Sequence, residues 1–107
     1  MSKPKDPIKE FEDKMIKEGK SLSFIKRCKR RLRDVVEVSK TMWIVRGRAS
    51  LGDWYSMYIV VYDENRGKFR CSCQSLERHY SGRRRKSMCT HVGAVILYSM
   101  VSKSDSD

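Results

Sequence analysis

The chain has 107 residues, with 24 Lys and Arg against 13 Asp and Glu, and a formal net charge of +11. This length favours one small domain, and the positive charge indicates either a polyanionic partner or a surface that is merely soluble. The sequence has no apolar run long enough to cross a membrane and starts with charged residues instead of a secretory signal, so we expect a cytoplasmic protein.

Residues 1–20 are predicted to form a loose arm and a short amphipathic helix. Asp6 can cap this helix, Pro7 suits its first turn, and Gly19 is a natural stop. Three apolar residues recur at helical spacing, namely Ile8, Phe11 and Met15. The helix either docks on the rest of the domain or binds a partner.

A second helix is predicted next, capped by Ser21 or Ser23. Its apolar stripe consists of Phe24, Cys28 and Leu32. Basic residues cover most of the remaining surface, namely Lys26, Arg27, Lys29, Arg30, Arg31 and Arg33. Such a helix either lies along phosphates or is an ordinary solvated surface. Cys28 falls on the apolar stripe, so we interpret it as a small buried hydrophobe and not as a ligand.

From Val35 the pattern becomes that of an antiparallel meander of three to four strands. The segment 55–62 is almost wholly apolar, so we expect it in the middle of the sheet with both faces covered. Turn residues surround it, with Gly52 before it and the segment 63–67 after it. Residues 68–73 form the return strand.

Side-chain alternation divides the return strand into two faces. Phe69, Cys71 and Cys73 point to one side, while Lys68 and Arg70 point to the other. In an earlier strand, Trp43, Val45 and Gly47 point to one side, and Ile44, Arg46 and Arg48 point to the other. If these strands are neighbours in the meander, four basic side chains share one outer face, namely Arg46, Arg48, Lys68 and Arg70.

Three cysteines and one histidine stand in two short clusters, Cys71-Ser72-Cys73 and, after fifteen residues, Cys89-Thr90-His91. Thiolate sulfur and imidazole nitrogen are the donors that Zn²⁺ prefers, and four of them complete its tetrahedron. The site is therefore predicted to be structural, without an open position for water. A disulfide framework is the alternative, but it is rare in cytosolic proteins. His79 is the only rival ligand, and the set is complete without it.

Backbone geometry restricts where these ligands lie. The strand must curl as it ends to bring two thiols together, so we place Cys73 at its last residue. Residues i and i+2 of a helix point about 200° apart, so Cys89 and His91 cannot both lie inside one. Cys89 is expected before the first turn and His91 within it. An apolar core helix of about ten residues follows, and residues 102–107 are predicted to be a disordered tail.

The pattern Cys-x-Cys followed by Cys-x-His resembles that of SWIM zinc fingers, over roughly residues 35–101. The resemblance implies Zn²⁺ bound by Cys71, Cys73, Cys89 and His91. SWIM domains occur in transposase-like proteins, chromatin ATPases, ubiquitin ligases and recombination mediators of the Shu type. A module that interacts with DNA or with proteins is therefore implied.

The predicted fold class is α+β, a small zinc-stabilised domain in which an antiparallel meander is followed by a C-terminal core helix and preceded by N-terminal helices. Residues 1–20 are the arm and first helix, residues 21–101 the zinc-binding domain with a zinc core at 35–101, and residues 102–107 the tail. Asn and Gln occur once each among many charged residues, a bias typical of heat-adapted proteins.

The favoured function is non-specific binding of nucleic acid, DNA rather than RNA. The predicted contacts are Arg30, Arg46, Arg48, Lys68, Arg70, Arg83, Arg84, Arg85 and Lys86. The alternative is a protein adaptor that pairs with a RecA-type recombinase paralogue through the N-terminal helix and aromatic residues such as Trp54 or Tyr80. No enzyme is expected, because the sequence offers no carboxylate pair beside a histidine, no phosphate-binding glycine loop and no open metal position.

Overall fold

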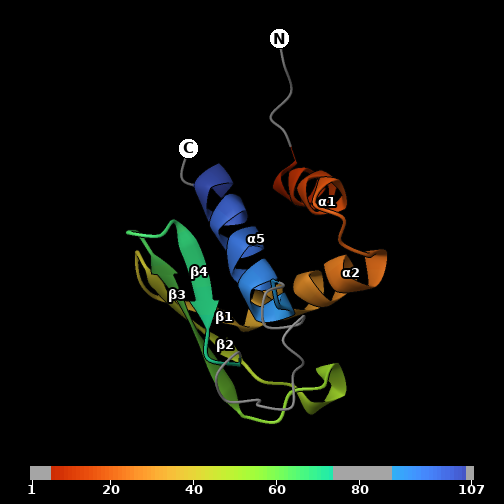
Figure 1. The fold of residues 1–107 in the computed structure, drawn as a ribbon. Helices are drawn as coiled ribbons and strands as arrows, with labels where there is room; N and C mark the ends of the chain where they lie inside the picture. The colour runs from red at the N-terminus through yellow and green to blue at the C-terminus, as the bar shows by residue number, and fades with distance from the viewer. Residues whose placement is uncertain (1–5, 74–87, 106–107) are drawn as a thin grey trace.

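The computed structural model describes residues 6–73 and 88–105 (Figure 1). Three α-helices and four strands make up this part of the chain, together with two 3₁₀ turns, η1 and η2. Their bounds are α1 Pro7–Lys17, α2 Leu22–Arg31, η1 Leu32–Asp34, β1 Val35–Ser39, β2 Met42–Arg46, η2 Ala49–Leu51, β3 Met57–Asp63, β4 Lys68–Cys71 and α5 Thr90–Asp105. The fold is α+β with helices before and after one antiparallel sheet, as predicted.

The sheet is a meander in which each strand pairs with the next, in the order β1-β2-β3-β4. Across the sheet, Ile44 pairs with Ile59, and Val61 pairs with Arg70. At the β3–β4 turn, the Asp63 carboxylate accepts hydrogen bonds from the backbone amides of Asn65 and Arg66, and Gly67 adopts a left-handed φ of 63°. The predicted turn chemistry therefore closes this hairpin.

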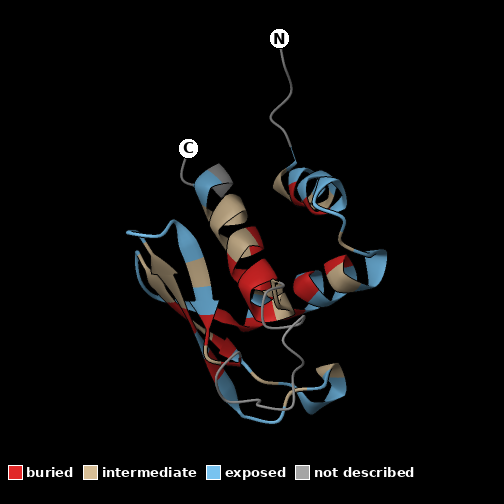
Figure 2. Cartoon of the chain, in the orientation of Figure 1, coloured by how far each residue is buried: buried red, intermediate tan, exposed pale blue. Residues whose placement is uncertain are grey.

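Helix α5 lies between the sheet and the pair α1–α2 (Figure 1). Its buried residues contribute to two core clusters (Figure 2). Val92 and Val95 pack against the sheet, whereas Leu97 packs against the N-terminal helices. Because α5 is covered on both sides, it carries apolar residues around most of its circumference.

The N-terminal helix is part of this core. Asp6 caps α1 by accepting a hydrogen bond from the Ile8 amide at 3.0 Å. Phe11 and Met15 are fully buried in the cluster that contains Leu97. The apolar face of α1 is therefore docked on the domain, which is one of the two arrangements predicted for it. In α2, the cap is Ser21 and not Ser23.

The burial of one strand and the ends of two elements differ from the prediction. β3 lies mid-sheet, but only Tyr58 and Val60 are buried along it, while Met57 and Ile59 are exposed, because α5 covers only one face of the sheet. β4 ends at Cys71, two residues early, since the chain must curl to bring its thiols together. The final helix continues to Asp105, because no glycine or proline follows Gly93 in it, so residues 102–105 are helical and not a disordered tail. The last two residues lie outside the described part.

No helix in the described ranges is both long and apolar enough to span a membrane.

Candidate metal centre

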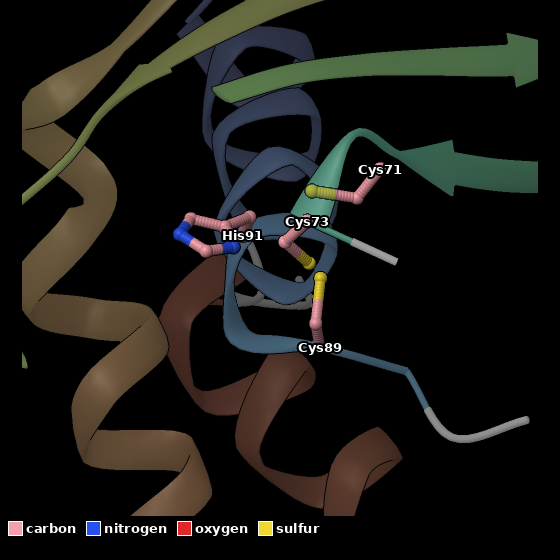
Figure 3. A group of neighbouring side chains, drawn as sticks. All are labelled: Cys71, Cys73, Cys89 and His91. Carbon is pink, nitrogen blue, oxygen red and sulfur yellow. The ribbon is translucent and has the colours of Figure 1, made fainter. Parts of the chain in front are cut away.

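Cys71, Cys73, Cys89 and His91 converge on one point, with ligand atoms that all lie within 4.8 Å of one another (Figure 3). Cys71 is the last residue of β4, and Cys73 follows two residues later. Cys89 lies directly before α5, and His91 is the second residue of that helix. The placement of Cys89 before the helix and His91 within it is as predicted. This group could hold a metal ion.

The four side chains are shielded from water. Cys73 is fully buried, Cys71 and His91 are nearly so, and Cys89 is partly buried. Hydrogen bonding with Cys73 and Cys89, reinforced by burial, raises the pKa of the Cys71 thiol. Hydrogen bonds from Cys71 and Cys73 lower the pKa of Cys89. A cation bound at this cluster would deprotonate its thiols.

The two ring nitrogens of His91 have different environments. Nε2 lies 3.0 Å from Oδ1 of Asp53, whereas Nδ1 is buried and has no hydrogen-bond partner among the described residues. A buried polar atom without a partner is rare in folded proteins. With the proton on Nε2 donated to the carboxylate, Nδ1 keeps a free lone pair for a metal. The donor set therefore fits a metal ion, with Nδ1 as the ligand atom of His91.

Asp53 is held in place by two further groups. It accepts hydrogen bonds from Nη1 and Nη2 of Arg31 at 2.5 and 3.0 Å, and from the backbone amide of Arg48 at 2.7 Å. Burial alone would raise the pKa of Asp53, but the hydrogen bonds from Arg31 and Arg48 outweigh it, and the pKa is lowered. The carboxylate is thus ionised, and it fixes the orientation of the His91 ring.

Arg31 joins α2 to this centre from inside the protein. Only 2% of its surface is exposed, and its Nε donates a hydrogen bond to Oγ1 of Thr90 at 2.9 Å. The expectation that Arg31 belongs to the solvated side of α2 is therefore wrong. Cys28 belongs to the apolar stripe, and Arg31 follows it by three residues. This helical spacing could have indicated that Arg31 is buried. Asp53 and Thr90 were also missed, because neither belongs to a recognisable motif.

Tyr58 supports the same histidine from β3. Its ring stacks on that of His91, with centroids 4.0 Å apart and planes tilted by 26°. Its hydroxyl oxygen accepts hydrogen bonds from the backbone amides of Trp54 and Tyr55. The sheet, the loop that carries Asp53, and helix α2 therefore all contact the imidazole or its carboxylate partner.

The predicted basic contacts are distributed over separate surfaces. Arg46, Lys68 and Arg70 lie on the outer face of the sheet, as the strand register requires. Arg48 does not, because β2 ends at Arg46 and the Arg48 guanidinium donates two hydrogen bonds to buried Asp34. The segment with the predicted contacts Arg83, Arg84, Arg85 and Lys86, and also with His79 and Tyr80, lies outside the described residues.

Arg30 belongs to a different layer from the sheet. It is exposed on α2, which α5 separates from the strands (Figure 1). Beside the metal centre, a cleft of about 430 Å³ opens towards α2, and Lys20 and Arg27 contribute to its lining. Apart from the buried Arg31, the basic residues that line this cleft are therefore Arg27, in the middle of α2, and Lys20, before the helix.

No protein-family model, curated protein or solved structure significantly matches this chain. The resemblance to SWIM zinc fingers stays a prediction.

Proposed function

We propose that this protein is a small zinc-stabilised module that binds nucleic acid without sequence specificity through helix α2. The Cys₃His donor set favours Zn²⁺ over harder cations such as Mg²⁺ and Ca²⁺, which select oxygen ligands. Four protein ligands leave no position for a reacting water, so the metal has a structural role. It joins the end of β4 to the beginning of α5.

The exposed basic residues of α2 and η1 carry the proposal for nucleic acid. We call them the α2 basic face, and they are Lys26, Arg27, Arg30 and Arg33. Lys26, Arg30 and Arg33 follow one another at helical spacing. No ion pair between described residues involves any of the four, whereas the neighbouring Lys29 is paired with Glu12 at 2.9 Å. Such unpaired cations are suited to phosphate contacts.

The α2 basic face also continues towards the metal centre, because Arg27 and Lys20 contribute to the lining of the adjoining cleft. Contacts of this kind attract any phosphate backbone, since they do not read base edges. We therefore propose binding to DNA and RNA alike, with affinity that depends on salt more than on sequence.

Fluorescence anisotropy with a labelled DNA duplex tests this proposal. Four phosphate contacts predict that log K falls with log salt with a slope of about −3.6. Replacing Lys26, Arg27 and Arg30 by Gln should reduce that slope by roughly 2.7 and weaken binding at least about tenfold. The matched control replaces three exposed lysines of α1 by Gln, namely Lys9, Lys14 and Lys17, and removes the same charge.

The control variant should lose much less affinity than the α2 variant. A third variant, with Gln at Arg46, Lys68 and Arg70, tests the sheet contacts that the sequence predicted, and it should behave like the control. Absence of binding at low salt, or equal losses in the α2 and α1 variants, would contradict the proposal. A separate variant measures how much the basic run before Cys89 contributes to DNA affinity. It has Gln in place of Arg83, Arg84, Arg85 and Lys86.

A further inference from the structure

The outer face of the sheet, on the side away from α5, carries a continuous aliphatic surface. Val36, Ile44 and Ile59 pair in register across β1, β2 and β3. Met57, Ile59 and Val61 follow one another along this face of β3. Met57 is 53%, Val36 51% and Ile59 42% exposed. We call the five residues Val36, Ile44, Met57, Ile59 and Val61 the aliphatic patch.

This arrangement is unusual for a solvated sheet face. The open face of an antiparallel sheet normally carries polar residues, particularly on its central strands. Strand spacing gives the patch a width of about 10 Å, and the rise along β3 gives a length of about 13 Å. Contiguous exposed apolar surfaces of this kind mark interaction sites.

Basic side chains stand at both ends of the aliphatic patch. Arg46 pairs with Met57 at one end, while Arg70 pairs with Val61 and Lys68 with Asp63 at the other. None of the ion pairs found between described residues includes Arg46, Lys68 or Arg70. Asp63 lies on the same face, but its Oδ2 is 3.8 Å from Arg66. The patch is therefore apolar in the middle and positive at its ends.

We propose that the aliphatic patch docks an amphipathic helix of a partner protein, which lies along β3 and carries acidic residues near both of its ends. A length of about 13 Å corresponds to roughly nine helical residues, enough for apolar residues at i, i+3 or i+4, and i+7. Helix α5 covers the opposite face of the sheet in a comparable way. This docking is independent of the nucleic-acid binding proposed for α2.

Charge and chemistry favour this occupant over two others. A second copy of the chain related by a two-fold axis would bring the positive ends of both patches together, and each chain carries a formal charge of +11. Single-stranded nucleic acid binds by stacking its bases on aromatic rings. The five residues of the patch are all aliphatic, so they offer no ring for stacking.

Peptide titration of the zinc-loaded, ¹⁵N-labelled full chain tests the proposal. The probe is a synthetic amphipathic helix of about 15 residues with leucines on one face and glutamates near both ends. Its matched control has the same leucines and lysines in place of the glutamates. The acidic peptide should shift amide resonances of β2 and β3, and should bind at least about tenfold more tightly than the basic peptide.

Two protein variants locate the contact. Ile59→Ser should weaken binding of the acidic peptide at least about tenfold, whereas Leu22→Ser, at an exposed apolar position on α2, should leave it unchanged. A charge reversal, Arg46→Glu with Arg70→Glu, should make the protein prefer the basic peptide, and this test does not depend on Ile59. Zinc content and amide dispersion verify that each variant is folded.

Several results would overturn the proposal. They are no shifts at about 1 mM acidic peptide, shifts confined to residues outside the four strands, or equal binding of the two peptides. A dimer detected by light scattering and abolished by Ile59→Ser would assign the face to a second copy. Shifts of the same amides with a single-stranded oligonucleotide would assign it to nucleic acid.

Discussion

At the scale of single residues, the structure assigns the orientation of His91 to a buried pair of opposite charges. The side chains of Arg31 and Asp53 are 2% and 4% exposed, respectively. Burying two charges costs free energy that their attraction offsets only when the remaining polar atoms are also satisfied. Here the carboxylate binds the imidazole as well as the guanidinium. The pair therefore links helix α2 to His91.

Replacing Asp53 by Asn removes the negative charge that holds the imidazole and leaves Arg31 buried without its counter-charge. We expect a loss of about 10–100-fold in zinc affinity, which is typical when a partner of a metal-bound histidine is changed. Competition with a chelator measures this loss. In the same variant, ¹⁵N resonances of the His91 ring should report mixed ligation through Nδ1 and Nε2.

Asp13→Asn is the matched control for that experiment, because Asp13 is exposed on α1. It should bind zinc as the wild type does. If the two variants have the same zinc affinity, Asp53 does not position His91.

Asp34 is the second buried carboxylate, and its pH dependence can be predicted. Hydrogen bonds from Arg48 lower the pKa of Asp34 in the folded protein. Its contribution to stability is therefore present above the pKa of the unfolded state, about 3.9, and is lost as pH falls through the lower folded value. Arg48→Gln should raise the folded pKa of Asp34 and move acid unfolding to a higher pH.

Carbon-detected NMR titration of the Asp34 carboxyl group measures this effect directly. Arg46→Gln is the control, since Arg46 acts on Asp34 only through its charge. An equally large shift in both variants would mean that the hydrogen bonds from Arg48 are not the cause.

At the scale of secondary-structure elements, helices α2 and α5 pack closely around Cys28 and Gly93. A methyl group added at Gly93 would lie 2.4 Å from Sγ of Cys28 and 3.3 Å from Cζ of Phe24. Burial also raises the pKa of the Cys28 thiol to about 12, so this sulfur is neutral at physiological pH. Cys28 therefore acts as a small packing residue, as its place on the apolar stripe predicted.

Gly93→Ala should destabilise the protein by about 1–3 kcal/mol through overpacking, although alanine favours helix over glycine by up to about 1 kcal/mol. Urea unfolding of the zinc-loaded protein measures the change. Cys28→Ala removes the sulfur and should recover part of the loss when it is combined with Gly93→Ala. If Gly93→Ala leaves the free energy of unfolding unchanged, or if the effects of the two substitutions on it are purely additive, the two helices adjust without strain.

Some elements follow from local patterns and others depend on tertiary packing. The α1 cap at Asp6 and the turn at Gly67 were predicted, because their signals lie within a few residues. The burial of Arg31 was not, since it requires Asp53 from a loop that is distant in the sequence. Likewise, the apolar sequence of β3 is compatible with a strand that is covered on one face or on both. It could not show that α5 covers only one face of the sheet.

At the scale of the whole molecule, the metal centre lies where the sheet, α2 and α5 meet. The convergence of Cys71, Cys73, Cys89 and His91 could be predicted from the sequence, because the types and spacing of these residues match the preferences of zinc. The distribution of charge could not, because α5 places Arg30 and the sheet residues Arg46, Lys68 and Arg70 in different layers. Residues 6–73 and 88–105 therefore present separate basic surfaces instead of one continuous one.

X-ray absorption at the zinc edge of the purified, zinc-loaded protein tests the central claim most directly. The structure predicts three sulfur neighbours at about 2.3 Å and one nitrogen at about 2.0 Å. Four sulfur neighbours would contradict it, since Cys28 would then replace His91. Oxygen neighbours would contradict it as well, because they would indicate an open coordination position at the metal.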